Sequence, residues 1–351
     1  MVFHCRCFSF SENEEIEYGT TTQTNSETFY TACSDLNRSE FSNLTEKPSN
    51  LRVFTVAELK AATNNFCRSS KIGEGGFGSV YKGLIKSLEY PFHEIQVAVK
   101  YADGVLQGHK EWVTEISVLG VVKHPNLVKL IGHCIDYNKR GIQLLLVYEY
   151  MANRSVRDHL SAKSQTPLSW NMRLKVAQDA ARGLTYLHED MDFQIIFRDF
   201  KSSNILLDGQ WNAKLSDFGL ARSGPREGLT HITTMFAGTM TYAAPEYIET
   251  GHLSTKCDVW SYGVFLYELI TGRPPLDRSR PRNEKKLLEW VKPYLDVKRL
   301  KLIIDSRLEG KYSIKSAQKL SFIASRCLRK DPKSRPNMSE VLEMVNQLIA
   351  V

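Results

Sequence analysis

The stretch QIIFRDFKSSNILLD, residues 194–208, decides the fold predicted for this chain. Its apolar runs QII and ILL predict two short buried strands, and the polar segment between them would form the connecting loop. Asp199, Lys201 and Asn204 would then lie together at the end of a buried hairpin, with an ordinary polar surface loop as the alternative. A carboxylate, an ammonium group and a carboxamide in one loop predict a site that orients a polar ligand.

A glycine-rich stretch, IGEGGFGSV at residues 72–80, gives the spacing Gly73-x-Gly75-x-x-Gly78. Dinucleotide-binding folds share this spacing, so the motif alone is weak evidence, and a plain glycine-rich hairpin is a further alternative. The residues that follow, FGSVYKGLI, alternate as a strand does and do not open a helix. We therefore predict a hairpin over a ligand, in which glycines let backbone N–H groups approach phosphate oxygens.

The run VAVK places Lys100 on a predicted strand, with Val97 and Val99 on the opposite face. A lysine that points into a protein needs a carboxylate partner, because an unpaired buried cation is costly. Glu115, in the helical segment WVTEISVLG, is the first choice, and Glu111, one turn earlier, is the second. The alternative is an ordinary solvated surface lysine.

Two further motifs follow along the chain. KLSDFGLA supplies Asp217, eighteen residues after Asp199, and YAAPEY contains the tripeptide APE at residues 244–246. Each motif could arise by chance, but five of them in this order predict phosphoryl transfer. Asp199 would orient an attacking hydroxyl and accept its proton, while Lys201 would neutralise the transferring phosphate. Asn204 and Asp217 would supply oxygen ligands for Mg²⁺.

With these five motifs in this order, the chain resembles the eukaryotic protein kinase family over about residues 66–349. The stretch DVWSYGVFLYELITG matches the buried central helix of that family, beginning at Asp258. Arg335 in SRPNMSEVL matches the arginine that pairs with the Glu of APE, here Glu246.

This resemblance implies an α+β, two-lobed fold in residues 67–351. The N-lobe, about residues 67–150, would be a small antiparallel sheet with one main helix, and the C-lobe, about residues 151–351, would be larger and helical. Residues 1–50 are acidic and rich in Ser, Thr, Asn and Glu, so we predict a disordered tail there. Residues 51–66 would form a docking helix segment.

Helix signals support this division. Thr55 and Glu58 have the spacing of a capping box, and Phe54 and Leu59 could form the flanking hydrophobic staple. A longer amphipathic helix is predicted in SWNMRLKVAQDAARGLTYLHE, where apolar residues recur at intervals of three and four.

Finer features resemble plant receptor-like cytoplasmic kinases, and among these the immune-signalling subfamily VII. They are FTVAELKAATNNF, GFGSVYKG, TYLHE, RDFKSSNILLD, and Tyr148 at the position that gates the back of the nucleotide pocket. This resemblance implies an ATP-dependent protein serine/threonine kinase that relays signals from cell-surface pattern-recognition receptors in plant immunity. Lys201 and Thr239 fit the Ser/Thr-specific pattern.

The same resemblance implies the ligands and partners. The enzyme would use ATP and Mg²⁺, with Mn²⁺ able to replace Mg²⁺. It would be a monomer that meets protein substrates and receptor kinase complexes at the plasma membrane in transient complexes. The residues assigned to nucleotide binding are Ile72, Gly73, Glu74, Gly75, Gly76, Phe77, Gly78, Val80, Ala98, Lys100, Glu115, Tyr148, Glu149, Met151 and Leu206.

Phe197 departs from the family pattern, which has histidine before Arg-Asp. In the family that ring packs on the Phe of DFG, here Phe218, and contacts neither ATP nor substrate. Phenylalanine would keep the packing and lose one polar contact, worth roughly 1 kcal/mol. Because every residue that handles a proton or a charge is present, we favour an active enzyme. The alternative is a weakly active or inactive kinase-like scaffold that binds nucleotide and receptor complexes.

Arg198 matches the arginine that pairs, in kinases of this type, with a phosphate on the activation loop. In the loop SGPREGLTHITTMFAGT, Thr233 and Thr234 are the preferred switch sites by resemblance, and Thr239 belongs to the same regulatory set. Thr241 replaces a glycine that is usual in the family, so the preferred substrate sequence stays open.

The charge is unevenly distributed. Residues 1–50 hold three basic and eight acidic residues, a net charge of −5, which leaves +12 on the rest of the chain. No nucleic-acid motif accompanies these dispersed basic residues, so we expect no nucleic acid partner. The basic stretch LDRSRPRNEKK predicts a solvated face, with docking of an acidic partner or of anionic lipid as the alternative.

The remaining observations concern location. Seven scattered cysteines without a metal-binding spacing are typical of a reducing compartment. No apolar run approaches the length of about eighteen residues that a membrane span needs, so we expect the cytoplasm and the cytoplasmic side of the plasma membrane. Val2 excludes the usual N-myristoylation motif. Cys5 and Cys7 are candidates for S-acylation, with two unmodified cysteines as the alternative.

Overall fold

The computed structural model describes residues 51–75, 78–87, 93–102, 107–138, 141–296 and 298–349. The predicted disordered tail of residues 1–50, with Cys5 and Cys7, lies outside the described residues, as do Gly76 and Phe77 of the glycine-rich loop. Within the described ranges, no helix is both long and apolar enough to cross a membrane.

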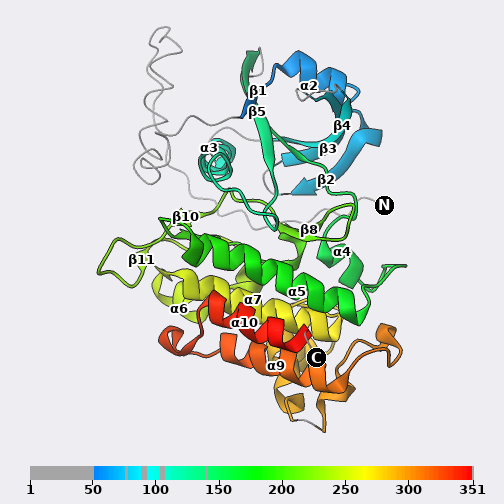
Figure 1. Ribbon diagram of the computed structural model, residues 1–351, viewed down its shortest axis with the longest axis vertical. Helices are drawn as coiled ribbons and strands as arrows, with labels where there is room; N and C mark the ends of the chain where they lie inside the picture. The colour runs from blue at the N-terminus through cyan, green and yellow to red at the C-terminus, as the bar shows by residue number, and fades with distance from the viewer. Residues whose placement is uncertain are drawn as a thin grey trace. The chain divides into compact units, whose positions relative to one another are not determined.

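A six-stranded sheet forms the N-lobe (Figure 1). Neighbouring strands run antiparallel, except that β1 pairs in parallel with β5, with Arg52 opposite Gly132 and Val53 opposite His133. In spatial order the strands are β1 (Arg52–Val53), β5 (Leu130–Asn138), β6 (Gly141–Glu149), β4 (Glu94–Tyr101), β3 (Gly78–Lys86) and β2 (Lys71–Gly75).

The two faces of this sheet differ in what they carry. Val80, Lys100 and Leu146 lie opposite one another in the register of β3, β4 and β6, so their side chains share one face. Val97 and Val99 alternate with Lys100 along β4 and are fully buried on the other face, as predicted.

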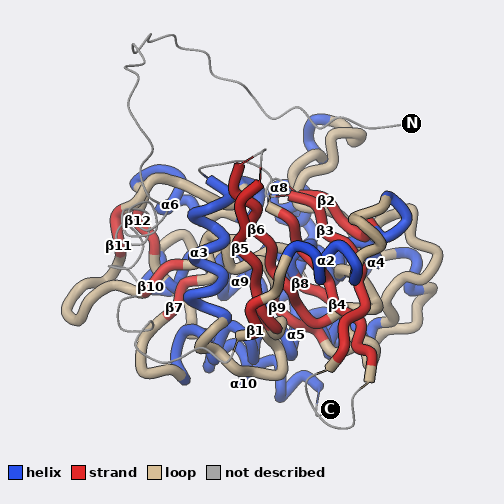
Figure 2. The backbone as a smooth tube through the Cα atoms, turned by 90° about the horizontal axis from the view of Figure 1, so that it is seen from above, coloured by secondary structure: helices blue, strands red, loops and turns tan. Residues whose placement is uncertain are grey.

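Two helices cover these faces (Figure 2). α3 (Gln107–Leu119) shares a hydrophobic core with Leu146, whereas α2 (Val56–Ala62) packs against β3 and β5 and brings Leu59 into a second core. The second core consists of Phe54, Leu59, Ile85, Val97, Val99, Cys134, Leu145 and Val147.

α2 begins as the sequence predicts. The Thr55 hydroxyl accepts a hydrogen bond from the Glu58 N–H at 3.1 Å, and the Glu58 carboxylate accepts one from the Thr55 N–H at 2.7 Å. The predicted capping box is therefore confirmed. Phe54 and Leu59 are buried in the same cluster, which fixes the angle at which the chain enters the helix.

The C-lobe is mainly helical. α5 (Trp170–Thr185) buries the apolar stripe that its periodicity predicts, and α7 (Thr255–Thr271) is buried along most of its length. Ser254 caps α7, so this helix begins one turn before Asp258, the predicted start. The other elements are α4 (Val156–Leu160), α6 (Pro245–Thr250), α8 (Leu287–Val291), α9 (Ile314–Cys327), α10 (Met338–Ile349), and the strand pairs β7 (Ile195–Ile196) with β10 (Arg222–Ser223), β8 (Ile205–Leu207) with β9 (Ala213–Leu215), and β11 (Ile232–Thr233) with β12 (His252–Leu253).

A sheet with one main helix on the site face, followed by a helical half, confirms the predicted α+β fold of two lobes. The opening stretch of sequence lies at the top of the C-lobe: β7 leads into the loop of Asp199, and β8 leads out of it. This arrangement sets the loop below the face of the sheet that carries Lys100.

Candidate active site

The glycine-rich stretch forms a hairpin. β2 and β3 pair antiparallel, with Gly75 opposite Gly78, so no helix opens at the third glycine. Gly78 has φ +132°, and a Cβ at this position would lie 1.9 Å from the carbonyl oxygen of Tyr101. Only glycine fits there. Ile72 is half exposed on β2, and Glu74 is drawn to Lys71 in an ion pair at 3.0 Å.

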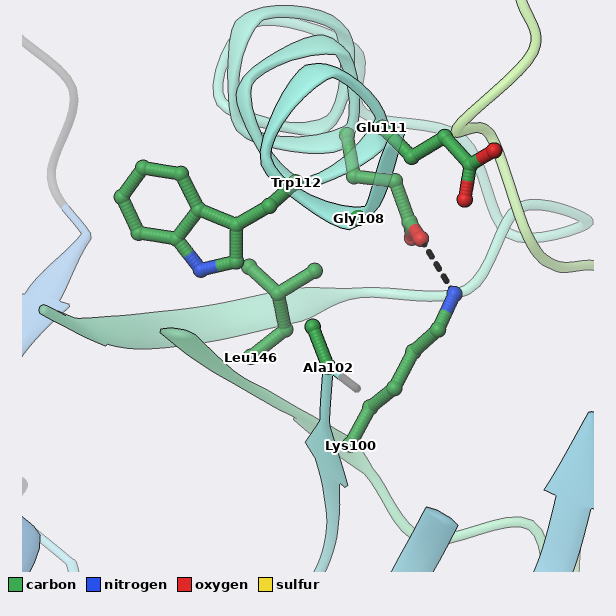
Figure 3. Close-up of a pocket in the computed structure, with 7 residues that line it drawn as sticks. Lys100, Ala102, Gly108, Glu111, Trp112 and Leu146 are labelled. Carbon is green, nitrogen blue, oxygen red and sulfur yellow. Dashed lines mark hydrogen bonds and ion pairs between the residues drawn. The ribbon is translucent and has the colours of Figure 1, made fainter. Parts of the chain in front are cut away.

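Lys100 joins the two lobes. Its Nζ lies 2.6 Å from Glu115 Oε1 on α3 and 2.7 Å from Asp217 Oδ1 in the C-lobe. Figure 3 shows the Lys100 side chain reaching toward α3, where a dashed line marks its ion pair, with Glu111 lining the same pocket. Glu115, the first of the two predicted partners, therefore makes the ion pair with Lys100.

The electrostatics of this cluster hold Lys100 in its charged form. Burial opposes the charge, but the carboxylates of Asp217 and Glu115 outweigh it and raise the pKa of Lys100. Burial alone would raise the pKa of Asp217. The positive charge of Lys100 outweighs burial, so the pKa of Asp217 is lowered. A fixed positive charge beside a carboxylate is an arrangement that can bind phosphate oxygens and a metal ion together.

Tyr148 completes the cluster in a way that the sequence did not predict. Its hydroxyl donates a short hydrogen bond to Glu115 Oε2, so Glu115 is held by Lys100 on one oxygen and by Tyr148 on the other. Ala98 lies opposite Tyr148 in the register of the sheet. Glu149, the next residue, forms an ion pair with Lys214 at 2.8 Å.

The other residues assigned to nucleotide binding come from both lobes. Val80 is half-buried on β3, on the same face as Lys100. Met151 is buried just after β6, and Leu206 is half-buried on β8 in the C-lobe.

Asp199 is buried, and other residues of the site converge on it. Lys201 Nζ donates to Oδ2 at 2.6 Å, and the Thr239 hydroxyl donates to Oδ1 at 2.7 Å. The Asn204 amide donates to the backbone carbonyl of Asp199 at 3.0 Å and to Oδ2 at 3.2 Å. The structure therefore brings together the three residues that the opening stretch predicts to meet, and adds Thr239.

The backbone before Asp199 is held by Asp258 of α7. Its carboxylate accepts the N–H groups of Phe197 and Arg198, each at 2.8 Å, and it contacts His188 Nε2 at 2.8 Å. These bonds support Arg198 at φ 73°, a backbone conformation that non-glycine residues rarely adopt. The signal in the sequence was an acidic residue near the start of a largely apolar helix, but nothing there identified its partners.

Phe197 packs as predicted. Its ring centroid lies 4.9 Å from that of Phe218 in an edge-to-face arrangement, and 6.3 Å from that of Phe200. Phe200 in turn contacts Phe265 of α7 at 5.5 Å. A continuous aromatic column thus runs under the loop, which is a favourable packing for rings.

Arg198 contacts the residue that directly follows the predicted switch sites Thr233 and Thr234. Its guanidinium donates to the Tyr247 hydroxyl at 2.6 Å and to the Met235 carbonyl at 2.7 Å. Thr233 is exposed on β11, and the Thr234 N–H is bonded to the Gly251 carbonyl at 3.0 Å.

The predicted pair of Glu246 and Arg335 is confirmed. Two parallel hydrogen bonds, of 2.7 and 2.8 Å, join the guanidinium of the fully buried Arg335 to the Glu246 carboxylate. Such bidentate geometry fixes the end of the activation segment to the helical core.

The donor set fits a hard divalent cation. Ser216, the residue before Asp217, donates both its N–H and its hydroxyl to the backbone carbonyl of Asn204, at 2.8 and 2.9 Å. These bonds hold Asn204 beside the segment that carries Asp217. Carboxylate and amide oxygens are ligands that Mg²⁺ accepts, with phosphate oxygens and water filling the other positions. Within the described ranges, no group of three or more His, Cys, Asp or Glu side chains forms a closed metal site.

Comparison with known proteins agrees with this geometry. Residues 66–345 match the family described as the protein kinase domain. Serine/threonine-protein kinase PCRK1 of Arabidopsis thaliana is 64% identical over 314 residues, which cover 89% of this chain and 75% of PCRK1. PCRK2 of the same plant is 63% identical over 318 residues, covering 90% of this chain and 76% of PCRK2. Serine/threonine-protein kinase PBL36, also from Arabidopsis thaliana, is 52% identical over 307 residues, covering 86% of this chain and 63% of PBL36.

Proposed function

Because the chain belongs to the protein kinase family and is a serine/threonine-protein kinase of the group that includes PCRK1 and PBL36, we propose that it transfers the γ-phosphate of ATP, with Mg²⁺, to protein hydroxyls through Asp199, Lys201, Asn204 and Asp217. The observation that carries this proposal is the double ion pair of Lys100 with Glu115 and Asp217. It unites the lobes around a charge suited to phosphate, and a scaffold without phosphoryl transfer would not need Asp199, Asn204 and Asp217 beside it.

The roles follow from the contacts of each group. ATP with its metal ion supplies the phosphoryl group and stabilises the leaving phosphate when bound. Lys100 offers a permanent positive charge to phosphate oxygens, and Glu115 keeps it in place. Asn204 and Asp217 would hold the metal ion.

Asp199 would act on the acceptor hydroxyl. Its Oδ1 accepts a hydrogen bond from the Thr239 hydroxyl at 2.7 Å, so this oxygen is already placed to bind a hydroxyl and take its proton. Lys201 donates to both Asp199 and Thr239, and it brings positive charge to the same point. A transferring phosphoryl group would be stabilised there.

The proposed enzyme acts in plant immune signalling. The support is the resemblance of its finer motifs to kinases that relay signals from pattern-recognition receptors, and its partners would be receptor kinase complexes at the plasma membrane. Co-precipitation of the chain with such receptor kinases before and after elicitor treatment tests this role. Absence of any association under both conditions would remove it.

The decisive experiment is phosphate transfer by purified protein. Wild type is incubated with ATP and Mg²⁺, alone and with a generic basic protein substrate, beside Asp199→Asn, and the modified sites are mapped by mass spectrometry. We expect incorporation by wild type and a loss of about a thousandfold in Asp199→Asn, which removes the base. Equal incorporation by both proteins would indicate a contaminating kinase. Nucleotide binding without any incorporation would favour the scaffold.

The same assay tests regulation. We propose that phosphate on Thr233 or Thr234 pairs with Arg198 and orders the activation segment. The support is the position of Arg198, whose guanidinium bonds neutral acceptors, the Tyr247 hydroxyl and the Met235 carbonyl, in the unphosphorylated chain. The Thr233→Ala, Thr234→Ala double variant should turn over more slowly, and unchanged turnover would refute the proposal.

Membrane attachment is proposed through Cys5 and Cys7. Two acyl chains give stable anchoring where one is marginal. Fractionation of cells that express wild type or the Cys5→Ser, Cys7→Ser variant tests it, and an identical distribution of the two proteins between membrane and soluble fractions would contradict it.

A further inference from the structure

A buried triangle of oxygen atoms lies directly behind the loop of Asp199. Ser202 belongs to the 3₁₀ turn Ser202–Asn204, Tyr242 ends the 3₁₀ turn Met240–Tyr242, and Glu268 lies on α7. Their exposed fractions are 0%, 7% and 3%, so water does not compete for these groups.

All three edges of the triangle are within hydrogen-bond distance. Ser202 Oγ lies 3.0 Å from Glu268 Oε1, Tyr242 Oη lies 2.5 Å from Glu268 Oε2, and Ser202 Oγ lies 3.0 Å from Tyr242 Oη. Each edge needs one hydrogen atom to be a bond and not a repulsion between lone pairs.

The number of available hydrogens differs between the two protonation states of Glu268. If Glu268 is ionised, the two hydroxyl hydrogens of Ser202 and Tyr242 both point to the carboxylate, and the edge between the two hydroxyls has none. If Glu268 is neutral, three hydrogens serve three edges in a closed ring: Glu268 donates to Ser202, Ser202 to Tyr242, and Tyr242 to Glu268. The Ser202 N–H also donates to Tyr242 Oη, at 3.4 Å, but it does not supply a hydrogen to the edge between the two hydroxyls, so all three edges are satisfied in the neutral form.

We propose that Glu268 is a positioning residue that acts as the neutral acid, closing a ring of three hydrogen bonds which ties the turn Met240–Tyr242, next to Thr239, to the loop of Asp199. This inference rests on the proposed phosphoryl transfer and assigns a further residue to it.

The surroundings of Glu268 agree with a neutral carboxyl group. Burial raises its pKa to about 8, against smaller lowering effects of Tyr242, of Ser202, and of the Arg157 guanidinium on α4. α4 packs against the turn that carries Ser202, and Arg157 itself is exposed, so its field is screened. Within the described part of the chain, these are the groups that act on the carboxyl.

The ring lies next to residues that contact Asp199, so a change in the protonation of Glu268 can alter their positions. Ser202 directly follows Lys201, which is bonded to Asp199. Tyr242 ends the turn that begins after Thr239, and Thr239 is bonded to the other carboxylate oxygen of Asp199. A second tie, from the Ser261 hydroxyl to the Tyr242 carbonyl at 2.8 Å, does not depend on protonation. Loss of one edge should therefore loosen peptide positioning without dismantling the site.

The test is the pH dependence of steady-state kinetics. The substrate is a peptide spanning a site mapped in the transfer assay, and wild type is compared with Glu268→Gln, Glu268→Ala, Ser202→Ala and Tyr242→Phe from pH 6.5 to about 9.5. The peptide KM of wild type should rise roughly fivefold as pH passes through about 8, while the KM for ATP stays level. Glutamine cannot ionise and can close the same ring, so Glu268→Gln should abolish that rise.

The other variants separate positioning from folding. Glu268→Ala should raise the peptide KM roughly tenfold already at pH 7, and Glu268→Gln should restore most of the loss. Ser202→Ala and Tyr242→Phe each remove one edge and should raise KM with a weaker dependence on pH. Glu289→Gln, an exposed change on α8, serves as the matched control with the wild-type profile. Thermal unfolding of each variant checks that it is folded.

Two outcomes would overturn the proposal. One is an identical pH profile for wild type and Glu268→Gln. The other is a Glu268→Gln variant whose peptide KM is raised as much as that of Glu268→Ala at every pH, with the largest rise for peptides that contain basic residues. That result would mean that Glu268 is ionised and binds the peptide directly. Infrared spectroscopy decides independently of turnover: a protonated carboxyl band present in wild type at pH 7 and absent in Glu268→Gln supports the proposal even if no phosphate transfer occurs, and its absence in wild type refutes it.

Discussion

Phe197 shows how backbone and side chain at one position can serve separate purposes. Its N–H is bonded to Asp258, a contact that any residue but proline can make, while its ring packs against Phe218 at 4.9 Å. A histidine ring in this apolar column would fit by shape and bring one polar edge. The residue type therefore affects packing more than it affects the reacting groups.

This argument predicts opposite results for two substitutions. Phe197→His should keep the transfer rate within about threefold of wild type, because the ring remains. Phe197→Ala should lower the free energy of unfolding by about 3–5 kcal/mol, since a fully buried ring is lost. Urea unfolding and the transfer assay measure both, with Phe322→Ala on the exposed side of α9 as control. A large loss of activity in Phe197→His at unchanged stability would contradict this account.

The residue scale also marks the limit of sequence analysis. Lys100, Glu115, Asp199, Asn204 and Asp217 could be predicted, because their chemistry demands a residue type at a characteristic spacing. The hydrogen bond from Tyr148 to Glu115 and the ring of Glu268 could not. Their partners lie 33, 26 and 66 residues apart, and only packing of the complete fold brings them into contact.

At the scale of elements, the segment before β2 belongs to the sheet. Its helix start could be predicted from Thr55 and Glu58, whereas β1 could not, because two residues of pairing leave no alternation to detect. Leu59 is fully buried in the core beneath β3 and β4, although the family match begins only at residue 66. This core therefore depends on residues outside the matched region.

Substitution in α2 tests that dependence. Leu59→Ala should lower the free energy of unfolding by about 2–4 kcal/mol, because it leaves a cavity in the second core. Lys60→Ala, on the exposed side of the same helix, should change it by less than about 0.5 kcal/mol. Urea unfolding measures the difference, and hydrogen exchange should show faster opening of β3 and β5 in Leu59→Ala. Equal stabilities of the two variants would mean that α2 contributes little to the core.

At the scale of the whole molecule, the two-lobed architecture could be predicted, because the motifs that carry the family resemblance, and their order, can be recognised in a single sequence. The coupling of folding to pH could not. It depends on how completely the fold removes Glu268 from water, and the sequence gives no measure of that burial.

This coupling has a defined sign. The pKa of Glu268 is raised in the folded chain to about 8, from an ordinary value of 4.5, so the neutral form stabilises the fold at low pH and that contribution declines between pH 4.5 and about 8. At pH 7 the contribution of Glu268 to the free energy of unfolding should be about 3 kcal/mol smaller than at pH 4.5. Urea unfolding of wild type and Glu268→Gln across this range should show a difference that shifts steadily in favour of the glutamine variant. A difference independent of pH would be inconsistent with a raised pKa.

The parallel contact of β1 with β5 bears on solubility. β5 would otherwise be an edge strand, and its free N–H and C=O groups would offer a template for pairing with another chain. Gly132 allows the covering strand to approach so closely that a Cβ there would lie 2.0 Å from the Arg52 carbonyl oxygen. A chain shortened to begin at residue 66 would uncover this edge together with the apolar surface beneath α2. Such a chain should aggregate at concentrations at which the longer chain stays dispersed, even though it retains every residue of the phosphoryl-transfer site.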